Sequence, residues 1–144
     1  PMTDELKTDK EEDADELFQQ HIEAQCKRLR ILGFTGTPII RGNLNAMDKS
    51  LLPSLQTVCT EILNNIAKHG KPGAFAFILS VGPDAVRIFA SNLYNAAINS
   101  APENHYGTAL IQDFAQQHNG TMTINSENEE WSLSLAIPLT HQTH

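Results

Sequence analysis

Four polar residues that could do chemistry lie on one short segment, residues 61–69. Glu61, Asn65 and Lys68 stand at positions i, i+4 and i+7, and His69 follows directly. In a helix this spacing places the first three on one stripe beside the apolar face. An amide oxygen suits Mg2+ when phosphates and water supply the other ligands, a carboxylate can orient or deprotonate a nucleophile, and cations bind phosphate oxygens. The spacing alone fits equally a solvated helix face with incidental charges.

A helix must present this stripe, and the apolar periodicity predicts one there. Apolar residues recur at three- and four-residue steps from Leu51 to Ile66, and Gly70 and Pro72 end the pattern. The same periodicity predicts two further helices. They cover residues 13–30 and 110–118, and Asn119-Gly120 provides a C-terminal cap for the second.

Alternating apolar residues predict strands in the remaining segments. We expect a short strand at 38–42, a hairpin with strands at 75–81 and 86–92, and a closing hairpin from 122 to 137 with its turn in 126–130. Residues 93–106 follow neither period, and their length predicts a loop that closes over a ligand. The order of elements predicts one mixed sheet with helices on a single face.

Residues 60–70 resemble the asparagine-box helix of histidine-kinase ATPase domains, the GHKL or Bergerat type, in the nitrate-sensor and lipid-sensor branch. That pattern runs Glu, two residues, Thr, Asn, two residues, Lys, His, Ala. The resemblance implies an α+β fold, a two-layer sandwich with a mixed, mainly antiparallel sheet, and it implies ATP and Mg2+ as ligands. It makes Asn65 the magnesium ligand and Glu61 the candidate catalytic base, with Lys68 and His69 as further nucleotide contacts.

The strand at 86–92 resembles the family strand that ends on an aspartate reading the adenine amino group. Counting alternate residues from Val86 places Asn92 on that aspartate, as in the quorum-sensing receptor kinases. Asparagine keeps a carbonyl acceptor but lacks the charge that makes such hydrogen bonds roughly twice as strong, so Asn92→Asp is expected to tighten binding. The following family glycine matches Tyr94, whose ring lies where the backbone should approach the base.

A third stretch, residues 106–110, resembles the second glycine box, Gly-x-Gly-Leu, in which backbone amides at a helix start hold phosphate. Gly107 and Leu110 match the box, and Thr108 takes its variable position. Ala109 replaces the second glycine and adds one methyl group near the phosphate path. The resemblance extends over residues 28–139, including the last helix and the closing hairpin.

The resemblance implies the following organisation and function. Residues 1–12 form a disordered acidic tail, 13–32 a helix that ends a dimerisation region, 33–140 the ATP-binding catalytic domain, and 141–144 a tail. The domain presents Mg-ATP for phosphoryl transfer to a His on a separate domain, and alone it is an inactive phosphotransferase, because His21 lies outside a phosphoacceptor pattern. Its implied partners are the dimerisation and phosphoacceptor domain, indirectly a response regulator, and a second copy through the 13–32 helix.

Two alternatives stay open at this point. The departures at Asn92, Tyr94 and Ala109 favour a degenerate Bergerat-fold module with a regulatory or partner-binding role. An anti-sigma-type serine kinase would share the site and differ only in its protein substrate.

Charge and hydropathy exclude several other classes of function. Eight of the 17 acidic residues precede Leu17, the net charge is −7, and no run of Lys and Arg forms a nucleic-acid footprint. No apolar stretch approaches the roughly 20 residues that cross a bilayer. We therefore expect a cytoplasmic location, either as a free protein or as part of a larger, membrane-anchored one. Cys26 and Cys59 are expected to be small core residues.

Overall fold

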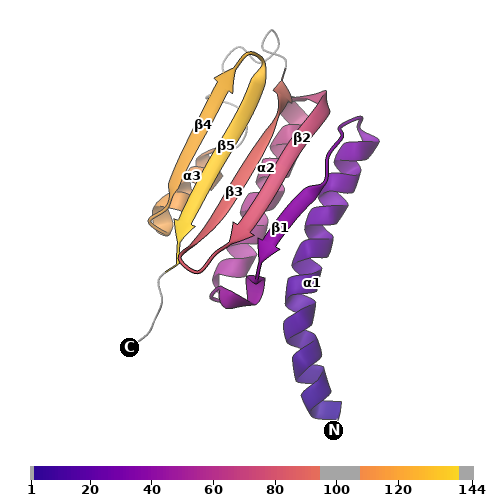
Figure 1. Ribbon diagram of the computed structural model, residues 1–144, viewed down its shortest axis with the longest axis vertical. Coiled ribbons are helices and arrows are strands. Elements are labelled where there is room, and N and C mark those ends of the chain that lie inside the picture. Colours follow the sequence, from indigo (N-terminus) through magenta and orange to yellow (C-terminus); the bar gives the residue numbers. More distant parts are fainter. Residues whose placement is uncertain (1, 95–107, 140–144) are drawn as a thin grey trace.

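The central helix organises the fold. The computed structural model describes residues 2–94 and 108–139, and the side chains from residue 16 onward except at residue 46. Helix α2, Leu51–His69, contains the predicted apolar stripe, and its residues Leu55, Cys59 and Ile62 are fully buried. Helix α2 lies behind the sheet (Figure 1), and its buried residues belong to the core that it shares with the strands.

Five strands form one mixed sheet. They are β1 Pro38–Gly42, β2 Gly70–Val81, β3 Ala85–Tyr94, β4 Thr121–Glu127 and β5 Glu130–Pro138. Their order across the sheet is β1-β2-β3-β5-β4, with β1 parallel to β2 and every other neighbouring pair antiparallel. The strand, hairpin and closing-hairpin predictions are confirmed, as is the α+β class.

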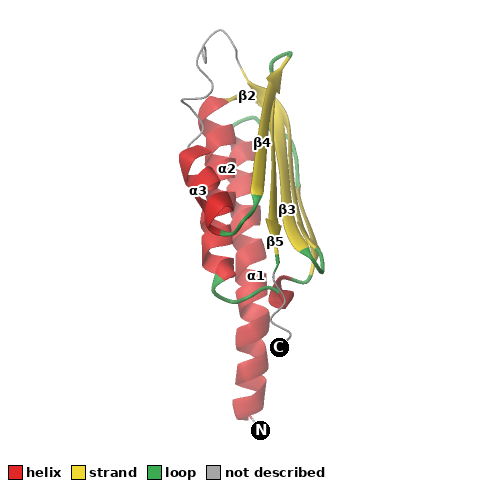
Figure 2. Cartoon of the chain, turned by 90° about the vertical axis from the view of Figure 1, so that its left-hand side faces the viewer, coloured by secondary structure: helices red, strands yellow, loops and turns green. Residues whose placement is uncertain are grey.

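The helices lie on one face of the sheet, and the other face is open (Figure 2). Helix α1, Met2–Ile31, packs beside α2 and β1 through Phe18, Ile22, Cys26 and Leu29, which are all buried. A 3-10 helix η1, Leu44–Ala46, precedes α2. Helix α3, Thr108–Gln117, completes the layer.

The cap of α3 follows the sequence prediction. Asn119 takes a left-handed backbone conformation with φ 58°, and the Gly120 N–H donates to the carbonyl of Ala115 at 2.6 Å. The next strand, β4, therefore begins directly at Thr121.

Several predicted boundaries differ from the structure, and α3 begins at Thr108 instead of residue 110. Helix α1 begins at Met2 instead of residue 13, since the Glu and Lys of the acidic segment are good helix formers. Strand β2 starts at Gly70, directly after α2, whereas the alternation becomes visible only at residue 75. Strand β3 extends to Tyr94, so the loop predicted at 93–106 was placed two residues too early, and its residues 95–106 lie outside the described part of the chain.

None of the helices in the described ranges combines the length and hydropathy that a membrane crossing needs.

Candidate functional site

The polar stripe of α2 is not uniformly exposed. Asn65 is only 2% exposed and lies within the buried face of the helix, so the alternative of a solvated helix face does not hold at this position. Glu61 and His69 are half-buried and Lys68 is exposed. The helix thus places one amide inside the protein and its three ionisable neighbours along the rim.

The Asn65 amide is incompletely satisfied. Its Nδ2 atom is buried and has no hydrogen-bond partner among the described residues. A buried donor without a partner costs roughly 1–3 kcal/mol, and such groups are rare in folded proteins. Only a hydrogen-bond acceptor beyond the described residues would remove that cost, because Nδ2 is a donor.

Asn92 lies at the same end of the molecule, on the inner face of β3. It is 4% exposed, and its Nδ2 donates to the backbone carbonyl of Leu93 at 2.7 Å. A Cβ atom at Gly70 would stand 2.2 Å from this Nδ2 and 2.4 Å from the carbonyl oxygen of Ile66. Asn92 therefore reaches the last turn of α2, and only glycine at position 70 permits this approach.

Asn65 and Asn92 are the two buried polar residues in the described part of the chain. The resemblance assigned them separately, one as a metal ligand and one as a base contact. In the structure both amides lie at the end of the molecule where α2 and β3 end.

Tyr94 completes this end of the inner face. It is 7% exposed, follows Asn92 by two residues on the same side of β3, and pairs with Gly70 across the sheet. Its ring is thus packed inside at the position where the resemblance places a glycine. The sequence gives no sign that Gly70, Asn92 and Tyr94 meet, because their contact depends on the strand beginning at the last turn of the helix.

The start of α3 supplies the other predicted residues. Thr108 is half-buried, whereas Ala109 and Leu110 are exposed at the first turn of the helix, where backbone N–H groups have no partner within the helix. Leu110 lines a groove of about 480 Å³ together with Ser54 of α2, on the half of that helix far from Asn65. Gly107 lies outside the described residues.

Four cavities in the described part of the chain lie away from these residues. They occupy the open face of the sheet, the α1–β1 side, the α2–α3 groove and the α1–α2 seam, and none is lined by Asn65, Asn92 or Tyr94. The described residues also contain no group of three or more His, Cys, Asp or Glu that could hold a metal ion. A magnesium ion at Asn65 would therefore depend on phosphates and water for its remaining ligands.

Both cysteines are core residues, as predicted. Burial raises the pKa of the Cys26 thiol from 9.0 to about 11, with the charge of Glu23 adding to the shift. Burial raises the pKa of Cys59 further. Neither thiol belongs to the site.

The fold described here is that of histidine kinase catalytic domains: three helices on one face of a five-stranded mixed sheet. The catalytic domain of histidine kinase ThkA, in a nucleotide-free form, superposes with a TM-score of 0.65 over 88% of this chain and 95% of that chain, at 11% identity. The Acinetobacter baumannii histidine kinase AdeS gives 0.62 over 90% and 65%, at 10% identity.

The Erythrobacter litoralis EL346 blue-light activated histidine kinase gives a TM-score of 0.61 over 83% of this chain and 41% of that one, at 12% identity. At such identities the likeness shows the fold alone. Comparison of the sequence with protein-family models and with curated proteins finds no match.

Proposed function

We propose that this chain is an ATP-binding catalytic domain of the histidine-kinase type. The observation that carries the proposal is the pair of buried amides, Asn65 and Asn92, at one end of a fold shared with such domains. Burying two amides at the same end, one of them short of a partner, is costly unless a ligand uses them.

In this proposal each residue of the site has a distinct role. The amide of Asn65 holds Mg2+ through its oxygen, and the ion neutralises charge on the phosphates when it is bound. Glu61, half-buried one turn earlier, orients the attacking group or accepts its proton. Lys68 and His69 at the rim contact phosphate oxygens. The carbonyl of Asn92 accepts a hydrogen bond from the adenine amino group.

The beginning of α3 would hold the phosphates through backbone amides of Gly107, Thr108, Ala109 and Leu110. The phosphoryl group would pass to a His on a separate dimerisation and phosphoacceptor domain, and from there to a response regulator. The long α1 extends past the sheet at its N-terminal end (Figure 1) and provides a route for pairing with a second copy. The nitrate-sensor and lipid-sensor branch and a cytoplasmic location belong to the same proposal.

The test is the thermal stability of the chain with Mg-ATP, Mg-ADP and ATP in excess EDTA. A ligand that binds the folded state at one hundred times its dissociation constant stabilises it by about 2.7 kcal/mol, which raises the melting temperature by several degrees. We expect this rise with both magnesium complexes and a smaller one in EDTA. Asn65→Ala should abolish the difference between magnesium and EDTA, and Asn64→Ala is the matched control. The absence of any rise would refute the proposal.

A degenerate, partner-binding module is the second candidate, and the buried ring of Tyr94 favours it. If Tyr94 and Ala109 exclude the nucleotide sterically, wild type and Asn92→Asp should both fail to bind, and binding should appear only in the Tyr94→Gly, Ala109→Gly double variant. Circular dichroism must show that this variant is folded, because removing a buried ring costs about 3–5 kcal/mol. An anti-sigma-type serine kinase would share the site, and phosphorylation of Ser instead of His would identify it.

A further inference from the structure

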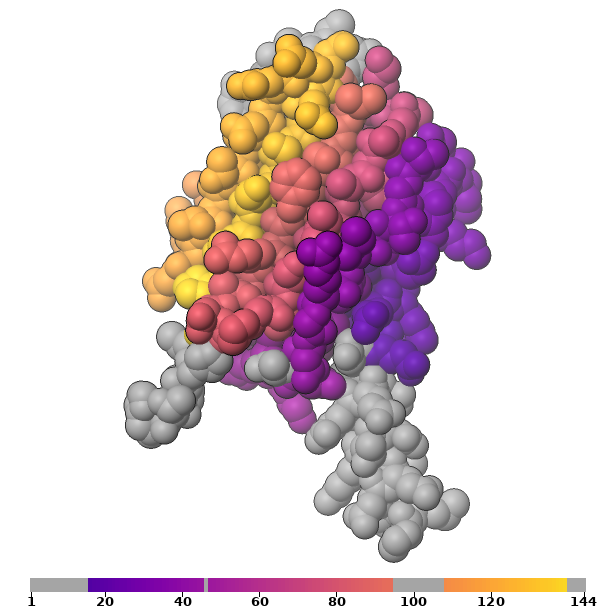
Figure 3. Space-filling view, viewed as in Figure 1, coloured from indigo at the N-terminus to yellow at the C-terminus, as the bar shows by residue number. Residues whose placement is uncertain are grey.

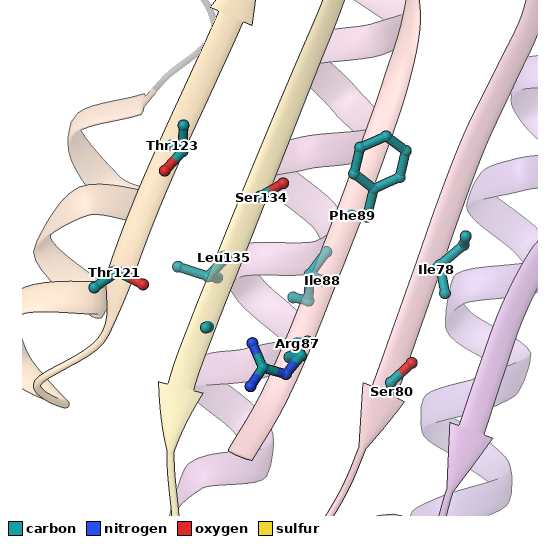
Figure 4. Close-up of a pocket in the computed structure, with 10 residues that line it drawn as sticks. Ile78, Ser80, Arg87, Ile88, Phe89, Thr121, Thr123, Ser134 and Leu135 are labelled. Carbon is teal, nitrogen blue, oxygen red and sulfur yellow. The ribbon is translucent and has the colours of Figure 1, made fainter.

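The open face of the sheet is organised as a surface that complements itself. This outer face is uncovered in the space-filling view (Figure 3) and contains a shallow cavity of about 310 Å³ (Figure 4). Ile39, Phe89 and Leu93 on this face are 41%, 39% and 37% exposed, and they are three of the seven exposed large apolar side chains in the described ranges. An exposed apolar patch of this kind marks an interaction surface.

The strand register arranges the outward side chains in four rows across the sheet. In order along the strands these are an arginine row (Arg41, Ser80, Arg87), a large apolar row (Ile39, Ile78, Phe89), a small row (Ala76, Ser91, Ser132) and an acidic row (Leu93, Glu130, Glu127). Because outward residues on a strand are two positions apart, neighbouring rows lie about 6.8 Å apart. The face is therefore positive at one end and negative at the other, with large side chains beside small ones.

We propose that two copies of the chain pair through this face about a two-fold axis that runs across the strands, between the large apolar row and the small row. Such an axis reverses the strand direction. It places the arginine row of one copy opposite the acidic row of its partner, and the large apolar row opposite the partner's small row. Phe89 then faces the partner's Ser91, and Ile78 faces the partner's Ala76, so large side chains meet small ones. Arg87 comes opposite the partner's Leu93 and beside the partner's Glu130.

The charges on this face are available for such a contact. Within the described residues, no ion pair or hydrogen bond involves the side chains of Arg87, Arg41, Glu130 or Glu127. Two copies related by any axis along the strands would instead set arginine row against arginine row. Charge complementarity therefore favours a second copy of the chain as the partner, and it favours the axis across the strands over one along them. The interface is isologous, because the same face of each copy contacts the other.

The size of the face suits a weak, specific dimer. Five strands about 4.8 Å apart and four rows about 6.8 Å apart cover on the order of 500 Å² per copy. The total of about 1,000 Å² is the lower limit for a specific interface, so we expect a dissociation constant in the micromolar range. Two sheets packed in this way lie about 10 Å apart, with their helix layers outward.

This pairing is distinct from pairing through α1. A two-fold axis across the strands directs the N-terminal ends of the two α1 helices in opposite directions, so the same two copies cannot also join in a parallel helix pair. It is also independent of nucleotide binding, because both helix layers and the Asn65–Asn92 end face away from the interface.

The experiment is sedimentation equilibrium of the full chain from about 1 to 100 μM, which brackets the expected constant. Wild type should dimerise. Arg87→Glu or Glu130→Arg alone should raise the dissociation constant about tenfold or more, because each sets like charges at positions 87 and 130 beside each other, and the two-fold axis repeats that contact. The double variant Arg87→Glu, Glu130→Arg restores the opposite charges in both contacts and should recover the wild-type constant within about threefold. Phe89→Asp should give a monomer.

Two variants outside the face serve as controls. Leu32→Asp changes an exposed apolar residue directly after α1 and should leave the dimer intact, and Leu17→Asp tests pairing through α1. A wild-type monomer at the highest concentration would overturn the proposal. So would a dimer that Leu17→Asp dissociates while Arg87→Glu does not, or a double variant as weak as the single ones.

Discussion

Replacing Asn65 with leucine should stabilise the protein while removing its magnesium dependence. Leucine has the same number and branching of side-chain heavy atoms as asparagine, so the change leaves almost no cavity at a position that is 2% exposed. It removes a buried Nδ2 without a partner, a group that costs roughly 1–3 kcal/mol. It also exchanges an amide for apolar atoms inside the core. We therefore expect the free energy of unfolding to rise by about 1–2 kcal/mol.

Urea denaturation with an unchanged m-value measures this gain, and thermal shift with Mg-ATP and with ATP in EDTA measures the loss of ligand response. Asn64→Leu is the matched control. Asn64 precedes Asn65 in the helix, is half-buried, and has no buried amide nitrogen without a hydrogen-bond partner. A loss of more than about 1 kcal/mol in Asn65→Leu would refute the reasoning, because it would show that the amide is satisfied and structural. A stabilised variant with full magnesium dependence would remove Asn65 from the metal site.

Three further predictions concern the framework. Gly70→Ala should cost about 1–3 kcal/mol in urea denaturation, because its Cβ would stand 2.4 Å from the backbone oxygen of Ile66 and 2.2 Å from Nδ2 of Asn92. Because the pKa of Cys26 is raised, the folded state holds the thiol proton up to a higher pH than the unfolded state does. The contribution of the protonated thiol to stability is complete below pH 9.0 and is lost as the pH rises through about 11. Cys26→Ala should flatten that part of the stability profile. Asn119→Ala should be about 1 kcal/mol less stable than Asn119→Gly, because the backbone there is left-handed.

The elements could be predicted from the sequence because periodicity reports which side of a segment is apolar. The stripe of α2, the β2–β3 hairpin and the cap at Asn119 all follow from local spacing. Burial of Asn65 could not be predicted, because an asparagine beside an apolar stripe has the same spacing whether it faces solvent or the sheet. The start of β2 was equally hidden, since residues 70–74 show no alternation.

Long-range contacts account for the other differences. Tyr94 and Gly70 are neighbours only through strand pairing, which links residues on opposite sides of the hairpin. The rows of the outer face likewise depend on register across five strands. A single sequence contains the residues of each row but no information on which of them stand opposite one another.

Asn92 shows how such contacts change a conclusion about chemistry. From the sequence, a carboxylate at this position should bind adenine more strongly, because it replaces a neutral hydrogen bond with a charge-assisted one. In the structure the Asn92 amide donates to the Leu93 carbonyl at 2.7 Å, which orients the side chain and reserves its own carbonyl as the acceptor. Aspartate cannot donate that bond and would set an anionic oxygen against a backbone carbonyl in a buried place. Asn92→Asp should therefore destabilise the empty domain by about 1–3 kcal/mol, which urea denaturation measures, whereas a titration of the folded domain reports only the difference between its empty and nucleotide-bound states.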